Sequence, residues 1–201
     1  VLIVLFCIWI ALGLQACTKR QLTVSDGGLI SKTPCGPPCF WGITPGKSTE
    51  AEVVQLFEDR QIMKQCTRFY SEIESGSRDF ICGFNISISF QKDKDLVESV
   101  GFRPYNLTLG EVVTMYGDPD AVLVLSGGTS QEHPPILTMS AYFDKIQTRV
   151  NLFDQEGVEY VVKSSTLISD VSYFDAPTYE SMKALPLQKW KGFGDYQPSN
   201  R

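Results

Sequence analysis

The sequence predicts an α+β fold made of two consecutive units, each a short helix followed by an antiparallel sheet, behind an N-terminal export signal. The same helix-start pattern occurs twice, at Thr49 and at Thr108, and it predicts two units. Each pattern is followed by segments in which apolar and polar residues alternate, as they do in half-buried strands. A short, uncharged and apolar N-terminus predicts the signal.

Residues 1–16 carry no charge and are too short to span a membrane, which takes about 20 apolar residues. They end in Leu14, Gln15 and Ala16, followed by Cys17. This run resembles the lipobox of bacterial lipoproteins, in which a leucine, a variable residue and a small residue precede the lipidated cysteine. The resemblance implies that Cys17 carries acyl chains after removal of the signal. An uncleaved anchor and a buried apolar helix remain as alternatives.

The composition and the net charge limit the classes of molecule that this protein is expected to bind. The 201-residue chain is 43% hydrophobic and 20% charged, which is typical of a globular protein with a core. Its net charge of −5 lies entirely after the signal, which argues against nucleic acid as a partner. We expect an extracytoplasmic protein held at a membrane by its lipid, and the outer membrane remains open in a cell with two membranes.

Four cysteines follow Cys17, and an even number in an exported chain favours disulfides over metal binding. Three pairings are open. We favour the two pairs that are close in sequence, of which the second brackets a predicted hairpin: Cys35 with Cys39 and Cys66 with Cys82. A zinc site is disfavoured because the chain has a single histidine and one closely spaced cysteine pair. No metal and no cofactor is expected.

Residues 17–39 are expected to form a flexible stalk that carries the lipidated cysteine, because polar residues and glycines dominate there. The first unit spans 40–103. Its helix begins at Thr49, which forms a capping box with Glu52. Strands are predicted at 66–73, 79–90 and 95–102.

The second unit spans 104–175. Its helix, from Thr108 to Tyr116, repeats the pattern of the first, with T-L-G-E-V-V-T-M-Y matching T-E-A-E-V-V-Q-L-F. Phe153 matches Phe90 at the end of a strand, so both are expected to face the helices. Strands are predicted at 121–126, 136–144, 147–154 and 158–168. Residues 176–201 are expected to form an extended tail without regular structure.

The first helix opens with Pro45, Gly46, Ser48, Glu52 and Val53. This motif resembles the small outer-membrane-assembly lipoproteins of the BamE/SmpA type, and two such units in tandem resemble the β-lactamase inhibitor protein. The run P-P-C-F-W-G-I-T-P-G is similar to a segment of uncharacterised bacterial lipoproteins that carry C-W-x-G-I-T-P-G. The resemblance implies a helix-plus-sheet fold and names no partner.

No pattern in the sequence predicts a catalytic site. His133 has no G-x-S-x-G nucleophile to serve, and Glu52 and Glu111 are explained as helix caps. The acidic runs at 93–95 and 154–157 lack the full calcium-loop pattern. The chain is therefore not expected to be an enzyme.

The candidate binding surface consists of Trp41, Tyr105 and Tyr142, although Trp41 is more simply explained as a plug over a disulfide. We predict a membrane-anchored extracytoplasmic lipoprotein that acts as a non-enzymatic binding or scaffold module for a protein or cell-envelope partner. Two alternatives remain open. One is an envelope enzyme with dispersed catalytic residues, and the other is a purely structural envelope component.

Overall fold

The computed structural model describes residues 24–71, 77–83, 85–127 and 134–199. The signal, the lipidation candidate Cys17 and His133 therefore lie outside the described residues. Within those ranges, no helix is both long enough and apolar enough to cross a membrane.

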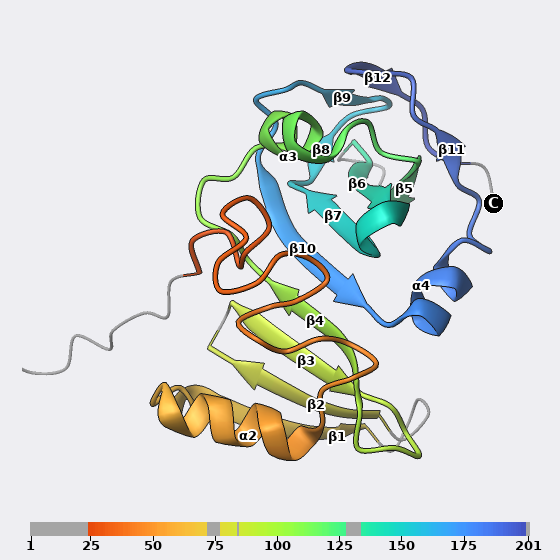
Figure 1. The fold of residues 1–201 in the computed structure, drawn as a ribbon. Coiled ribbons are helices and arrows are strands. Elements are labelled where there is room, and N and C mark those ends of the chain that lie inside the picture. The colour runs from red at the N-terminus through yellow and green to blue at the C-terminus, as the bar shows by residue number, and fades with distance from the viewer. Residues whose placement is uncertain (1–23, 72–76, 84, 128–133, 200–201) are drawn as a thin grey trace, which may run out of the picture.

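Most strands of the described residues join one antiparallel sheet of ten strands (Figure 1). Their order is β1-β2-β3-β4-β10-β7-β6-β5-β11, with β8 paired to β6 beside this path. A separate ladder joins β9 and β12. The strands are β1 Cys66–Ser71, β2 Ser77–Cys82, β3 Ile86–Phe90, β4 Val97–Phe102, β5 Ala121–Gly127, β6 Ile136–Phe143, β7 Thr148–Leu152, β8 Gln155–Glu156, β9 Tyr160–Val162, β10 Ile168–Phe174, β11 Gln188–Lys189 and β12 Gly194–Tyr196.

The predicted fold class, two consecutive units each with its own helix and sheet, is wrong. Strand β4 pairs with β10, the long strand near the end of the chain, so the two groups of strands merge into one sheet. Of the described residues, 40% are strand and only 19% are helix. Pairing through β10 satisfies backbone groups that would stay unpaired if β4 were an edge. The tandem BamE/SmpA-like arrangement, and with it that of the β-lactamase inhibitor protein, is not the fold of this chain.

The second group of strands also differs from the prediction in detail. Strand β7 pairs with β10. The predicted final strand 158–168 is broken, since it contains β9, which pairs with the C-terminal β12, and only the first residue of β10, Ile168. Phe90 is buried, but its expected counterpart Phe153 is 56% exposed. Strand β7 ends at Leu152, so Phe153 leaves the ladder and does not face a helix.

Both predicted helices begin where the capping boxes place them. Helix α2, Glu50–Asp59, is capped by Thr49, and α3, Leu109–Tyr116, is capped by Thr108. In each, the threonine oxygen accepts from a backbone N–H and the glutamate accepts from the cap N–H, which satisfies two groups that the helix leaves open. Figure 1 shows α2 along the β1 end of the sheet and α3 toward the opposite end. The described residues also form α4 Ala176–Met182 and two short 3-10 turns, Met63–Gln65 and Asp144–Ile146.

The N-terminal segment from Val24 onward belongs to the folded protein, so the expected stalk over 17–39 is too long. Val24 and Leu29 are buried in the main core. Burial raises the pKa of Asp26, but hydrogen bonds from Ser31 and neighbouring backbone groups outweigh burial and bring the pKa below its ordinary value. The charged Asp26 carboxylate therefore stabilises the turn that places Leu29.

The C-terminal segment is also ordered, contrary to the expectation of a tail without regular structure. It forms α4, β11 and β12. Trp190 is 7% exposed and stacks on buried Tyr196 with ring centroids 5.7 Å apart. Aromatic burial of this kind holds the segment against β5 and β9.

Both favoured disulfides are confirmed. Cys35 is bonded to Cys39, and Cys66 is bonded to Cys82. The second bond joins directly opposed residues at the end of the β1–β2 hairpin, as the bracketing pattern predicts.

Candidate functional site

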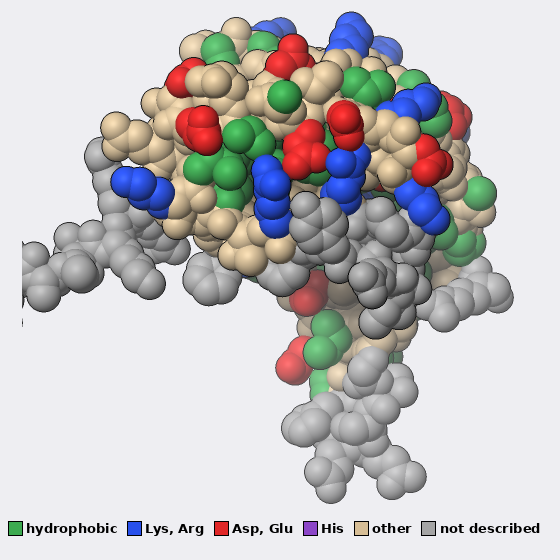
Figure 2. Space-filling model, turned by 90° about the horizontal axis from the view of Figure 1, so that it is seen from below, with side chains coloured by type: hydrophobic (Ala, Val, Ile, Leu, Met, Phe, Trp, Pro, Cys, Tyr) green, Lys and Arg blue, Asp and Glu red, His purple; other side chains and the backbone are tan. Residues whose placement is uncertain are grey.

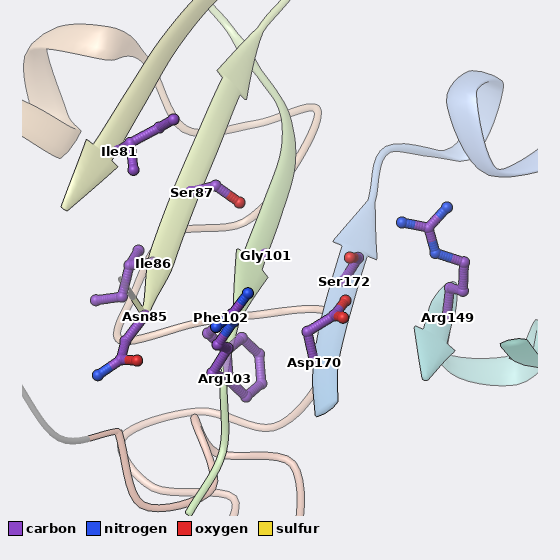
Figure 3. Close-up of a pocket in the computed structure, with 10 residues that line it drawn as sticks. All are labelled: Ile81, Asn85, Ile86, Ser87, Gly101, Phe102, Arg103, Arg149, Asp170 and Ser172. Atoms are coloured by element: carbon purple, nitrogen blue, oxygen red, sulfur yellow. The ribbon is translucent and has the colours of Figure 1, made fainter. Parts of the chain in front are cut away.

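The candidate site is a groove on the face of the sheet that α2 and α3 leave uncovered. Alternation along β3 buries Ile86, Ile88 and Phe90 in the core and turns Ser87 outward. Two adjoining cavities, of about 290 and about 510 Å³, lie on this outward face. Both are lined by Arg103, Arg149 and Asp170, and we name the combined hollow the sheet groove. Figure 3 shows the residues that line the smaller cavity.

Small side chains form the floor of the sheet groove. Ser87 lies opposite Gly101, and Gly101 lies opposite Ser172, on the neighbouring strands β3, β4 and β10. Arg149 of β7 follows as the next partner in the same row. A Cβ at Gly101 would lie 2.5 Å from Ser87 Oγ, so glycine keeps this row low. A bound chain can therefore approach the sheet closely.

A hydrogen-bonded network forms one side of the groove. Ser140 Oγ donates to Asn151 Oδ1, and Asn151 Nδ2 donates to Asp170 Oδ1, each at 2.6 Å. Ser169 Oγ lies 3.1 Å from the second oxygen of Asp170. Both oxygens of this carboxylate are therefore engaged by neighbouring side chains, which holds it in place.

Arg149 is positioned by aromatic packing. Its Cζ lies 5.3 Å from the centre of the Phe174 ring, within cation–π range. Burial raises the pKa of the neighbouring Tyr142, and the Arg149 charge acts in the opposite direction. Phe174 and Tyr142 belong to a second buried cluster that includes Tyr179 of α4. Helix α4 thus anchors the aromatic wall that holds the guanidinium at the groove.

The ends of the groove carry exposed apolar side chains. Ile81 lines the smaller cavity and is 41% exposed, while Phe153 lines the larger cavity and is 56% exposed. Arg103, directly after β4, is exposed and lines both cavities. Arginine and aromatic residues are enriched at protein interfaces, so this combination is typical of a recognition surface.

The residues of the sequence-predicted surface are not brought together. Trp41 is half-buried against the main core, stacks on Phe40 with centroids 4.5 Å apart, and lies under Arg60. Tyr142 is 1% exposed and forms part of the wall below Arg149. Tyr105 alone is well exposed, at 69%.

The groove itself was missed from the sequence. The alternation I-S-I-S-F does place serines on an outward face, and it was the one available signal. Arg103, Arg149 and Asp170 meet only because β10 inserts between β4 and β7. Local sequence patterns do not show which distant strands pair, so they could not predict that these three residues would meet.

The serines of the groove have no histidine base beside them among the described residues, because the chain's single histidine, His133, lies outside those residues. Ser140 donates to an amide oxygen, which does not take up its proton, so this pair does not activate a nucleophile. Glu52 and Glu111 serve as helix caps. Across the described residues, no cluster of His, Cys, Asp and Glu side chains could hold a metal ion.

Comparison with known proteins adds no homology to this picture. No protein-family model matches the chain, and no curated protein or solved structure matches it either. A function must therefore be argued from the chemistry of the groove.

Proposed function

We propose that this chain is a lipid-tethered extracytoplasmic protein that binds a ligand in the sheet groove and catalyses no reaction. Cys17 carries the lipid, and the folded domain from Val24 onward presents the groove. The tether is supported by the lipobox-like run that ends at Cys17. The extracytoplasmic location is supported by the two disulfides, which persist in oxidising compartments.

One observation carries the binding function. The sheet buries one face in the core, while the other face keeps an uncovered polar groove with two arginines at its centre. The solvent-exposed face of an antiparallel sheet usually carries polar residues that are spread along its strands. Two arginines gathered in one groove are not needed for the stability of such a face. Aligned small side chains, a held arginine and apolar ends together suit ligand recognition.

The tether and the groove are tested in one experiment. A photoreactive benzoylphenylalanine replaces either exposed Ser87 in the groove or exposed Lys92 in the β3–β4 turn, and membranes from cells fed a clickable fatty acid are irradiated. We expect the protein to carry the fatty acid and to form a discrete adduct from position 87 but not from position 92. Cys17→Ala should abolish the label and release the protein from the membrane fraction.

Three results would contradict the proposal. Label that persists after Cys17→Ala would refute the lipid site. Adducts that are absent at position 87, or equally abundant at both positions, would refute the groove as the binding surface. The two parts of the proposal can therefore fail separately.

A further inference from the structure

Two guanidinium groups in the sheet groove, those of Arg103 and Arg149, have no carboxylate partner among the described residues. Within the described residues, the ion pairs involve Arg68, Arg78 and Lys183, and neither Arg103 nor Arg149 takes part in one. We propose that the groove binds a protein segment in which one or two carboxylates are flanked by apolar side chains. This inference rests on the proposed function and names the class of its ligand.

Arg149 is the central contact. No carboxylate among the described residues pairs with its guanidinium, and its buried Nε lies beside the Tyr142 hydroxyl, to which Arg149 is hydrogen-bonded. The guanidinium lines both cavities, so a ligand carboxylate would bind its terminal nitrogens through the paired geometry that guanidinium and carboxylate share. The Phe174 ring already holds the group, so little side-chain entropy is lost when a ligand binds.

Arg103 is the second contact, at the open end of β4. Two acidic side chains line the groove together with the arginines, and one of them, Asp154, lies only at the larger cavity. The other, Asp170, is held by Asn151 and Ser169. Its engagement leaves Arg103 available, while its charge limits how many anionic groups the groove tolerates. The local charge therefore suits a ligand with one or two carboxylates better than a ligand with a long run of acidic residues.

The charge of the whole protein excludes a polyanion. The net charge is −5, and Figure 2 shows Lys and Arg side chains interspersed with Asp and Glu on the face it presents. A nucleic acid or an acidic polymer would be repelled at long range, whereas a short contact with two arginines is governed by local geometry.

The shape of the groove favours a protein segment over a small anion. The two adjoining cavities, of about 290 and about 510 Å³, are together larger than a single carboxylate would fill. Ile81 and Phe153 at the two ends offer contacts for apolar side chains on either side of a central acid. The row of small residues Ser87, Gly101 and Ser172 leaves room for a peptide backbone to lie close to the sheet.

The test uses a random-peptide display library, selected on the immobilised full chain in detergent. Selected peptides should be enriched in Asp or Glu beside aromatic or aliphatic residues. A fluorescent copy of the best peptide should bind, and its Asn/Gln analogue should bind at least about tenfold more weakly, as expected for loss of charged hydrogen bonds.

Variants of the protein assign the contact. Arg103→Gln and Arg149→Gln should each weaken binding of the acidic peptide by about tenfold or more. Lys92→Gln removes the same charge outside the groove and should change the affinity less than about twofold. Arg149→Lys keeps the charge but loses the planar fork, so it should restore little affinity.

The results of the peptide-binding test can be told apart from those of the crosslinking test of the proposed function. No enrichment of acidic peptides, or equal weakening by Arg103→Gln and Lys92→Gln, overturns this inference even where the position-87 adduct forms. Circular dichroism checks the fold of each variant. If Arg149→Gln unfolds the protein, the comparison of exposed Arg103 with Lys92 decides alone.

Discussion

At the scale of single residues, Gly110 shows where local preference and tertiary contact disagree. It lies in the first turn of α3, where alanine is intrinsically favoured over glycine by about 1 kcal/mol. Its N–H donates to the Ser164 carbonyl oxygen at 2.8 Å, and an added Cβ would lie 2.6 Å from that same oxygen. The clash involves backbone rather than a flexible side chain, so it cannot be relieved by rotation.

Gly110→Ala should therefore destabilise the protein, by about 1–3 kcal/mol in the free energy of unfolding. Gly127→Ala is the matched control, because nothing lies within 4 Å of its Cβ position and its φ is not positive. The control should be neutral or slightly stabilising. Urea unfolding measures both, and a stabilised Gly110→Ala variant would show that α3 does not approach Ser164 so closely.

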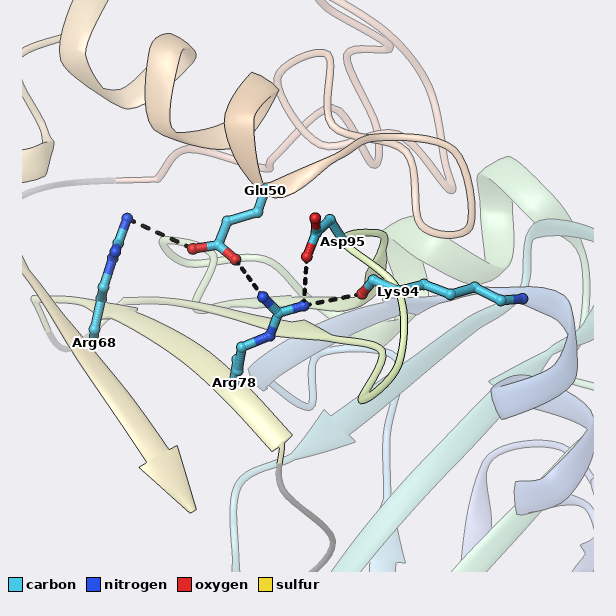
Figure 4. A network of polar contacts seen from close by, with 5 residues as sticks. All are labelled: Glu50, Arg68, Arg78, Lys94 and Asp95. Atoms are coloured by element: carbon cyan, nitrogen blue, oxygen red, sulfur yellow. Dashed lines mark hydrogen bonds and ion pairs between the residues drawn. The ribbon is translucent and has the colours of Figure 1, made fainter. Parts of the chain in front are cut away.

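At the scale of elements, one guanidinium ties together a helix, a strand and a turn (Figure 4). Arg78 of β2 donates to Glu50 Oε2 at the start of α2 at 3.0 Å, and to Asp95 Oδ1 in the β3–β4 turn at 2.9 Å. It also donates to the Lys94 carbonyl oxygen at 3.0 Å. Arg68 contacts the same Glu50 from β1, at 3.5 Å.

Arg78→Ala should cost about 1–3 kcal/mol of unfolding free energy, because it removes several charge-assisted hydrogen bonds from a side chain that is only 27% exposed. Arg68 is 49% exposed and makes a longer contact, so Arg68→Ala should cost less than about 1 kcal/mol. Thermal unfolding at low and high salt measures both. An equal loss of unfolding free energy in the two variants would mean that the Arg78 network stabilises the protein no more than an exposed surface ion pair does.

At the scale of the whole molecule, one hydrophobic cluster runs from the N-terminal segment to β12. Phe102 of β4 connects its parts, since its ring stacks on Phe40 at 4.9 Å and meets Tyr173 of β10 edge-on at 5.3 Å. A continuous core of this kind favours a single cooperative transition over independent unfolding of two halves.

Phe57→Ala tests that cooperativity. Truncation of this fully buried aromatic should cost about 3–5 kcal/mol. In a Trp9→Phe, Trp41→Phe background, Trp190 is the one remaining tryptophan of the sequence, and its fluorescence reports the C-terminal part of the chain. Its unfolding midpoint should fall together with the circular dichroism signal, and an unchanged Trp190 midpoint would show that the two ends unfold separately.

The sequence determined those features that depend on neighbours along the chain. Capping boxes at Thr49 and Thr108 predicted both helix starts, since cap and partner lie three residues apart. The disulfide from Cys66 to Cys82 followed from a hairpin between them. The alternation of 86–90 predicted the buried face of β3. The single strand predicted at 79–90 is wrong, because a turn divides it into β2 and β3, which pair with each other.

Only the tertiary structure decided which distant strands pair and what their outward faces share. Ladder hydrogen bonds are made by backbone groups that every residue carries, so alternation identifies a strand without naming its partner. The pairing of β10 with both β4 and β7 turned two expected sheets into one. The same pairing set Ser87, Gly101, Ser172 and Arg149 in one row, and so created the groove.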